Sequence, residues 1–270
     1  MIYVLLAINS LLMILLPLLL GIWLARRYKV GWLLFLIGAL GFVVSQVGHL
    51  TFNQFILNPI IASLMEQADT IGRNLLIALL LGLSAGVFEE VTRYLFYFFR
   101  KSMRRWDQGL MFGAGWGGIE SIILGLLAAT TIVNLYIYQS GAIESLLPAD
   151  ALTENAAAIA AGAQQFEELL NSPPWYFLLG TVERIFALTL HLSLSILVLQ
   201  AFLRKSIIWL FVAIGWHALV NGFAVFGSLQ GWDVLLIEAG VAVSAIISFL
   251  IIRYFKPQDI AAEEDISAAN

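Results

Sequence analysis

Long apolar runs occupy most of this chain, and each is long enough to cross a lipid bilayer as a helix. The runs cover residues 2–25, 32–57, 74–99, 109–139, 175–203, 206–228 and 233–254. Apolar residues make up 61% of the 270 residues and charged residues only 12%, whereas a soluble domain carries about 25% charged residues. The sequence therefore predicts an all-α fold, a polytopic membrane bundle of about seven transmembrane helices.

The basic residues predict how this bundle is oriented, because Lys and Arg accumulate in cytoplasmic loops. Eleven of the fourteen basic residues fall on one side of the membrane: Arg26, Arg27, Lys29, Arg100, Lys101, Arg104, Arg105, Arg204, Lys205, Arg253 and Lys256. Arg73 is the one basic residue in a loop on the other side. We therefore expect the N-terminus outside and the C-terminus in the cytoplasm, in the cell membrane of a prokaryote.

Domain organisation follows from the same pattern. We expect one transmembrane domain over residues 1–256 and a disordered, acidic cytoplasmic tail over residues 257–270. The connection 140–174 is acidic and Ala-rich, which predicts an extracytoplasmic connector with a surface helix that ends before Pro173. The chain has no cysteine, which excludes disulfides and thiolate nucleophiles. We find no basic patch of the kind that binds nucleic acid.

Ionisable residues inside the predicted helices are costly, at roughly 2.5–3.5 kcal/mol each, and need partners or water. Four of them lie eleven to thirteen residues from the charge at the cytoplasmic end of their own helix: Glu89, Glu120, His191 and His217. That spacing places all four about 16–20 Å into a hydrocarbon core of about 30 Å. Because four separate helices bring a polar group to one depth, we expect these groups to meet in one hydrated cavity.

The spacing within each helix supports this expectation. Glu89 and Arg93 are four residues apart and share one helical face, with Glu90 about 100° away. His217 and Asn221 share a face in the sixth run. Both pairs can therefore point into the same interior.

A stripe of small residues leads to Glu120. Gly109, Gly113 and Gly117 are spaced four residues apart, and Glu120 continues their face. Small residues at this spacing allow neighbouring helices to approach closely, so Glu120 is expected to face protein rather than lipid. His49 lies near the outer boundary of its helix, and we interpret it as an interfacial histidine outside the site.

These residue types are suited to hydrolysis. A buried carboxylate can act as a general base on water, and His and Asn donors one turn apart can stabilise an oxyanion. Glu and His side chains are also zinc ligands, although the HExxH signature is absent. From the residues alone, the polar cluster fits hydrolysis and ion transport equally.

Four short motifs carry a resemblance to a known group of proteins. Glu89-Glu90-Val-Thr-Arg93 resembles the EExxR motif of an intramembrane protease superfamily that includes CAAX prenyl endopeptidases, bacteriocin-immunity-like proteins and PrsW. Trp116-Gly-Gly-Ile-Glu120, Glu183-Arg184 with His191, and His217-Ala-Leu-Val-Asn221 resemble the motifs that follow. Over residues 80–225, their order and spacing are most similar to the YhfC family of intramembrane metalloproteases.

The resemblance implies an intramembrane endopeptidase that acts on a membrane-associated peptide entering between helices. Glu89 would activate water, with Glu90 beside it and Arg93 tuning both. His217 and Asn221 would bind the oxyanion. Glu120 and His191 would complete the site.

Two departures bear on the metal. Trp116 stands where relatives carry Phe or His, and Asn221 stands where PrsW carries Asp. Both changes favour a glutamate-activated water over a metal-bound one. If zinc is bound, the candidate ligands are Glu120, His191 and His217. Trp116 itself is expected to pack or to contact lipid rather than to recognise substrate.

Two functions of other classes remain open. The first is a non-catalytic scaffold or immunity-type membrane protein with the same fold, in which Glu89, Glu90 and Arg93 form a structural ion pair. The second is a proton-coupled transporter that uses the midplane carboxylates as a relay. A transporter predicts repeated halves with broken helices, and the sequence shows no such repeat.

Overall fold

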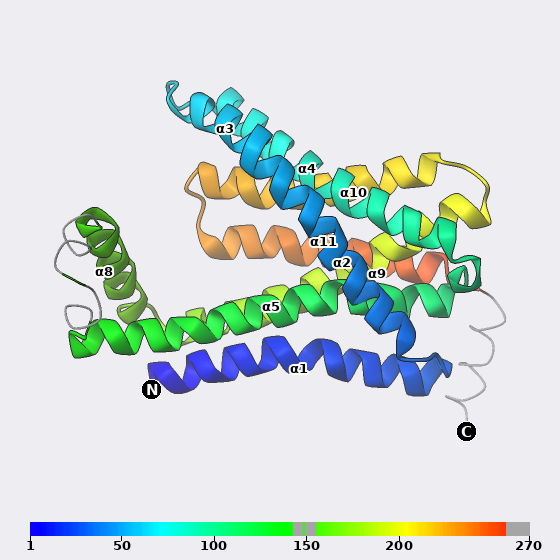
Figure 1. Ribbon diagram of the computed structural model, residues 1–270, viewed down its shortest axis with the longest axis horizontal. Helices are drawn as coiled ribbons and strands as arrows, with labels where there is room; N and C mark the ends of the chain where they lie inside the picture. Colours follow the sequence, from blue (N-terminus) through cyan, green and yellow to red (C-terminus); the bar gives the residue numbers. More distant parts are fainter. Residues whose placement is uncertain (143–147, 149–154, 258–270) are drawn as a thin grey trace. The chain divides into compact units, whose positions relative to one another are not determined.

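A computed structural model describes residues 1–142, 148 and 155–257 of the chain (Figure 1). Seven helical segments in this part are long and apolar enough to cross a membrane, and the described residues contain no strand. They are α1 (Ile2–Tyr28), Leu33–Met65, α4 (Ile71–Phe99), α5 (Trp106–Ser140), Pro174–Leu203, α10 (Ile208–Leu229) and α11 (Val234–Tyr254). The predicted fold class and number of spans are confirmed, while the orientation stays a prediction.

Two of the seven segments are composite. The second consists of α2 (Leu33–Phe52), the π-helical turn η1 (Asn53–Leu57) and α3 (Asn58–Met65). The fifth consists of the short 3₁₀ helix η3 (Pro174–Leu178) and α9 (Leu179–Leu203). Polar caps start α4 and α11, because the side chains of Thr70 and Asp233 accept hydrogen bonds from the backbone N–H groups of Arg73 and Leu235 in the first turns.

The chain divides into two compact units, which are described separately. The first comprises Met1–Leu16 and Ser121–Arg184. Its small core contains Leu6, Leu135 and Phe177, and the side chain of Asn9 accepts a 2.8 Å hydrogen bond from the backbone of Thr181. This unit contains α8 (Ala156–Leu170), which lies within the connector 140–174, and the extracytoplasmic position of that connector stays a prediction. Residues 143–147 and 149–154 of that connector lie outside the described residues.

The second unit comprises Pro17–Glu120 and Ile185–Asn270. Within it α4 and α10 run side by side, and α2 crosses α4 (Figure 1). Close approach of α4 and α10 depends on glycine, because a Cβ at Gly82 would lie 2.4 Å from the backbone oxygen of Ala218. The predicted acidic tail falls on residues 258–270, which lie outside the described residues, and the prediction of one transmembrane domain stays a prediction.

Candidate functional site

The centre of the site is a fully buried ion pair on α4. Arg93 and Glu90 are both 0% exposed, and Arg93 Nη1 donates a 2.6 Å hydrogen bond to Glu90 Oε2. The other oxygen of Glu90 accepts a 2.8 Å hydrogen bond from His217 Nδ1 on α10. An unpaired charge in this environment would be costly, so the pair and its histidine form one unit.

Glu89 is also buried but has different partners. Its Oε1 accepts a 3.1 Å hydrogen bond from Gln46 Nε2 on α2, and its Oε2 accepts a 2.9 Å hydrogen bond from Trp116 Nε1 on α5. Both donors are uncharged. The two neighbouring carboxylates are therefore held in distinct ways, Glu90 by Arg93 and His217, and Glu89 by an amide and an indole.

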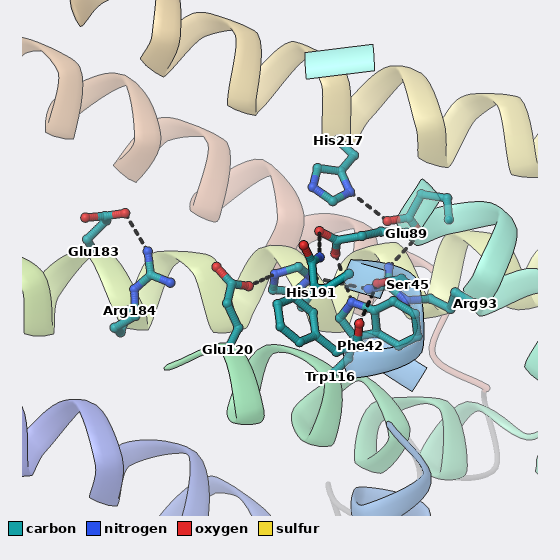
Figure 2. A network of polar contacts seen from close by, with 12 residues as sticks. Phe42, Ser45, Glu89, Arg93, Trp116, Glu120, Glu183, Arg184, His191 and His217 are labelled. Carbon is teal, nitrogen blue, oxygen red and sulfur yellow. Dashed lines mark hydrogen bonds and ion pairs between the residues drawn. The ribbon is translucent and has the colours of Figure 1, made fainter. Parts of the chain in front are cut away.

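His191 on α9 links the ion pair to Glu120 on α5 (Figure 2). Arg93 Nη2 lies 3.2 Å from His191 Nδ1, and arginine can only donate, so Nδ1 accepts. His191 Nε2 then donates to Glu120 Oε2 at 2.6 Å. Since both ring nitrogens form hydrogen bonds, the His191 ring is held in one orientation between Glu120 and Arg93.

His217 differs from His191 in this respect. Its Nδ1 donates to Glu90, which leaves Nε2 as the nitrogen that can serve another group. The two imidazole rings are nearly perpendicular, with centroids 5.8 Å apart. A histidine whose second nitrogen donates to a carboxylate is the usual arrangement for a metal ligand.

A set of metal-ligand atoms lies within this cluster. Glu89, Glu90 and His217 each offer one such atom, and these atoms lie within 4.8 Å of one another. Two carboxylates and an imidazole suit zinc and other divalent cations, so the donor set fits a metal. Glu120 and His191, which the sequence suggested as ligands beside His217, are instead joined to each other.

The structure thus brings together Glu89, Glu120, His191 and His217, as their common depth predicted, and Glu90 and Arg93 lie among them. Asn221 is half-buried one turn beyond His217, and no hydrogen bond joins it to this network in the described part of the chain. Glu183 and Arg184 form an ion pair with each other (Figure 2).

Trp116 has a larger part than the sequence indicated. It is 0% exposed, so it contacts no lipid, and the Arg93 guanidinium lies over its ring at 4.4 Å. It therefore contacts Glu89 and Arg93 at once. A tryptophan at the start of a motif that ends in Glu120 was the available signal.

A second feature that the sequence did not indicate is a chain of hydrogen bonds leading away from Glu89. Ser84 donates to Asn53, which donates to His49, which donates to Gln46, which donates to Glu89, with all four distances between 2.6 and 3.2 Å. His49 does not touch the ionisable cluster, but it holds Gln46 in place. Gln46, His49 and Asn53 follow the spacing i, i+3, i+7 along one helical face, which is the signal that could have revealed the chain.

The glycine stripe on α5 faces α9. A Cβ at Gly117 would lie 2.8 Å from His191 Cδ2, on a ring held at both nitrogens. We expect Gly117→Ala to lower the free energy of unfolding by about 1–3 kcal/mol, because the ring cannot yield without losing a hydrogen bond. Gly215→Ala on α10 is the control, since its Cβ would meet nothing within 4 Å. Thermal melting in detergent compares them, and equal midpoints would contradict the expectation.

Comparison with known proteins gives two matches. Residues 12–246 match the family described as YhfC intramembrane metalloprotease. Over 253 residues the chain is 34% identical to "Uncharacterized membrane protein YhfC" of Bacillus subtilis (strain 168), covering 92% of this chain and 91% of that protein. No solved structure matches the chain.

Proposed function

Because the chain belongs to the YhfC intramembrane metalloprotease family, we propose that it is a membrane-embedded endopeptidase that hydrolyses peptide bonds of membrane-associated polypeptides. The observation that carries the proposal is the buried group of Glu89, Glu90 and His217, whose ligand atoms lie within 4.8 Å of one another. Hydrolysis requires a base, an electrophilic aid and restricted water at one point, and this group is placed to supply them.

Glu89 is the carboxylate best placed to accept a proton from the attacking water. Both oxygens of Glu90 are engaged by Arg93 and His217, which stabilise its charge. Glu89 accepts only from the uncharged N–H groups of Gln46 and Trp116, and each of its oxygens keeps a second acceptor position. We therefore assign proton transfer to Glu89 and a holding role to Glu90.

Glu89, Glu90 and His217 are the residues that would hold a metal, each through one atom, so the second oxygen of Glu89 would remain for proton transfer. A divalent metal there would supply Lewis acidity and make a bound water more acidic. His217 would ligate through one ring nitrogen, and Glu89 and Glu90 through one carboxylate oxygen each. This arrangement supports the metal-dependent form of the reaction over the metal-free form that the departures at Trp116 and Asn221 favoured.

Asn221 remains the residue best suited to donate to an oxyanion. Its amide lies one turn from His217, and no described side chain engages it. The side-chain N–H of an amide can stabilise negative charge on a peptide carbonyl oxygen. A His217 that holds a metal is committed to that role, so we propose that the oxyanion role that the sequence divided between His217 and Asn221 passes to Asn221.

Arg93, His191 and Glu120 position these groups. Arg93 touches Glu90, His191 and the Trp116 ring, so it joins α4 to α9 and α5. Glu120 holds His191 from the other side. Glu89, Glu90 and His217 can be held within about 0.5 Å of a reactive geometry only if partners of this kind fix their side chains.

The arrangement supports hydrolysis over transport. A proton-coupled transporter needs carboxylates in sequence toward both faces of the membrane. Glu89 and Glu90 are instead adjacent and share their surroundings with His217. We also propose a place for the chain within the wider CAAX and PrsW superfamily, and the prokaryotic cell membrane as its location.

Cleavage by purified protein tests the proposal. We would reconstitute the chain in liposomes with a library of single-span peptides, identify products by mass spectrometry, and measure bound metal in the same samples. We expect cuts within or beside the apolar segment, and loss of both metal and cleavage in His217→Ala. A folded wild-type protein that cuts no peptide in the library would favour the scaffold function. Equal cleavage by His217→Ala would exclude His217 from the reaction.

A further inference from the structure

A cavity lies in the second compact unit, and none of the residues that line it belongs to the polar cluster. It has a volume of about 510 Å³ and is lined by α1, α5, α9 and α11. Most of its wall is apolar, from residues such as Leu20, Leu24, Leu110 and Leu192. Apolar cavities of about 300–1,000 Å³ with a few polar groups are the usual form of small-molecule sites.

Three cations line one end of this cavity. Arg27 comes from the last turn of α1, Arg253 from the last turn of α11, and Lys256 follows α11. Leu20 lies seven residues before Arg27, which corresponds to about 10 Å along the helix. The cavity is therefore amphipathic, with a cationic mouth and an apolar depth.

Aromatic rings brace the mouth. Trp106 Nε1 donates a 3.2 Å hydrogen bond to the backbone oxygen of Ile252, which ties α5 to α11. The Tyr28 ring meets the Trp106 ring edge-on at 5.5 Å, and Lys256 Nζ lies 5.9 Å from the Trp106 ring. Tyr and Trp are typical of the level where hydrocarbon meets headgroups.

We propose that this cavity binds an anionic phospholipid, with its phosphate between the three cations and the first part of one acyl chain along the leucines. Basic pockets between transmembrane helices on the cytoplasmic side recognise acidic headgroups in this way. The predicted orientation places the mouth in the cytoplasmic leaflet. The proposal does not rest on the proposed protease function.

The test compares lipid binding by two charge-matched double variants. Arg27→Gln with Arg253→Gln removes two cations from the cavity, whereas Arg26→Gln with Arg100→Gln removes two exposed cations that do not line it. Full-length protein is placed in nanodiscs of phosphatidylcholine, with or without phosphatidylglycerol. Thermal midpoints and native mass spectra report stabilisation and retained lipid.

We expect phosphatidylglycerol to raise the midpoint of the wild type and of the Arg26/Arg100 variant. The Arg27/Arg253 variant should lose about 10-fold or more in apparent affinity, since each cation near a headgroup contributes about 1 kcal/mol. Lys256→Gln gives a milder second variant in case the double substitution impairs folding. Equal losses in both double variants would reduce the effect to general surface charge and overturn the proposal.

Two further experiments test whether free phosphate or the acidic residues after Lys256, rather than a lipid, occupy the cavity. Inorganic phosphate added to phosphatidylcholine nanodiscs should not reproduce the shift, and if it does, the lipid proposal fails. The acidic residues after Lys256 in the sequence are the other source of negative charge: Asp259, Glu263, Glu264 and Asp265. Neutralising them should leave the phosphatidylglycerol response unchanged. If this change instead abolishes the difference between the double variants, the chain's own tail is the occupant and the proposal is overturned.

Discussion

Glu89→Gln should lower kcat for peptide-bond cleavage by about 10²–10⁴-fold while leaving KM within a few fold. The substitution keeps the size of the side chain but removes the oxygen that accepts a proton from water. Trp116 and Gln46 both donate to Glu89, and a glutamine can accept from only one of them through its single oxygen. The measurement is steady-state cleavage of a peptide selected from the liposome library.

Glu66→Gln is the matched control. Glu66 is exposed at the end of α3, so the same change in charge should leave kcat and KM unaltered. Thermal midpoints of both variants must be measured alongside, because a fall in activity has meaning only for folded protein. Unchanged kcat in Glu89→Gln would remove Glu89 from the reaction and would direct attention to Glu90.

The fold was predictable because the membrane restricts the choice. Each run of about 20 apolar residues has few alternatives to a spanning helix, and all seven predicted spans are present. The ends were less accurate. The second span was predicted to end at residue 57 but continues through η1 to Met65, because a π turn carries the helix onward without a break.

The gathering of the polar residues was predictable from depth. Counting residues along a regular helix gives height in the membrane, and residues at one height in a small bundle can meet. Glu120, His191 and His217 do so through the contacts of Arg93 and Glu90, and Glu89 lies beside Glu90 and His217. The pairings were not predictable, because they depend on helix rotation and rotamers, which residue counting does not give.

The same limit explains the residues that were missed. Gln46 and Trp116 carry no formal charge, so a search for costly ions inside the membrane passes over them. They approach Glu89 only because α2 and α5 pack against α4 in one particular way. His49 was judged by height alone, yet i, i+3 and i+7 spacing links it through Gln46 to Glu89.

Arg93→Met should lower the free energy of unfolding by about 3–5 kcal/mol, the largest stability effect that we expect in this chain. Arg93 and Glu90 are both 0% exposed, so the substitution leaves a buried carboxylate without its cation. It also removes the donor to His191 and the cation over the Trp116 ring. The measurement is reversible unfolding by SDS titration in mixed micelles.

A second substitution separates charge from packing. Adding Glu90→Gln to Arg93→Met removes the unpaired charge, so part of the loss should return, with a coupling of about 0.5–3 kcal/mol between the two positions. Arg105→Gln is the control, because Arg105 is largely exposed and its pair with Asp107 should be worth about 0–1 kcal/mol. Additive losses at positions 90 and 93, or a loss in Arg93→Met as small as that in Arg105→Gln, would contradict the view that this ion pair holds the site together.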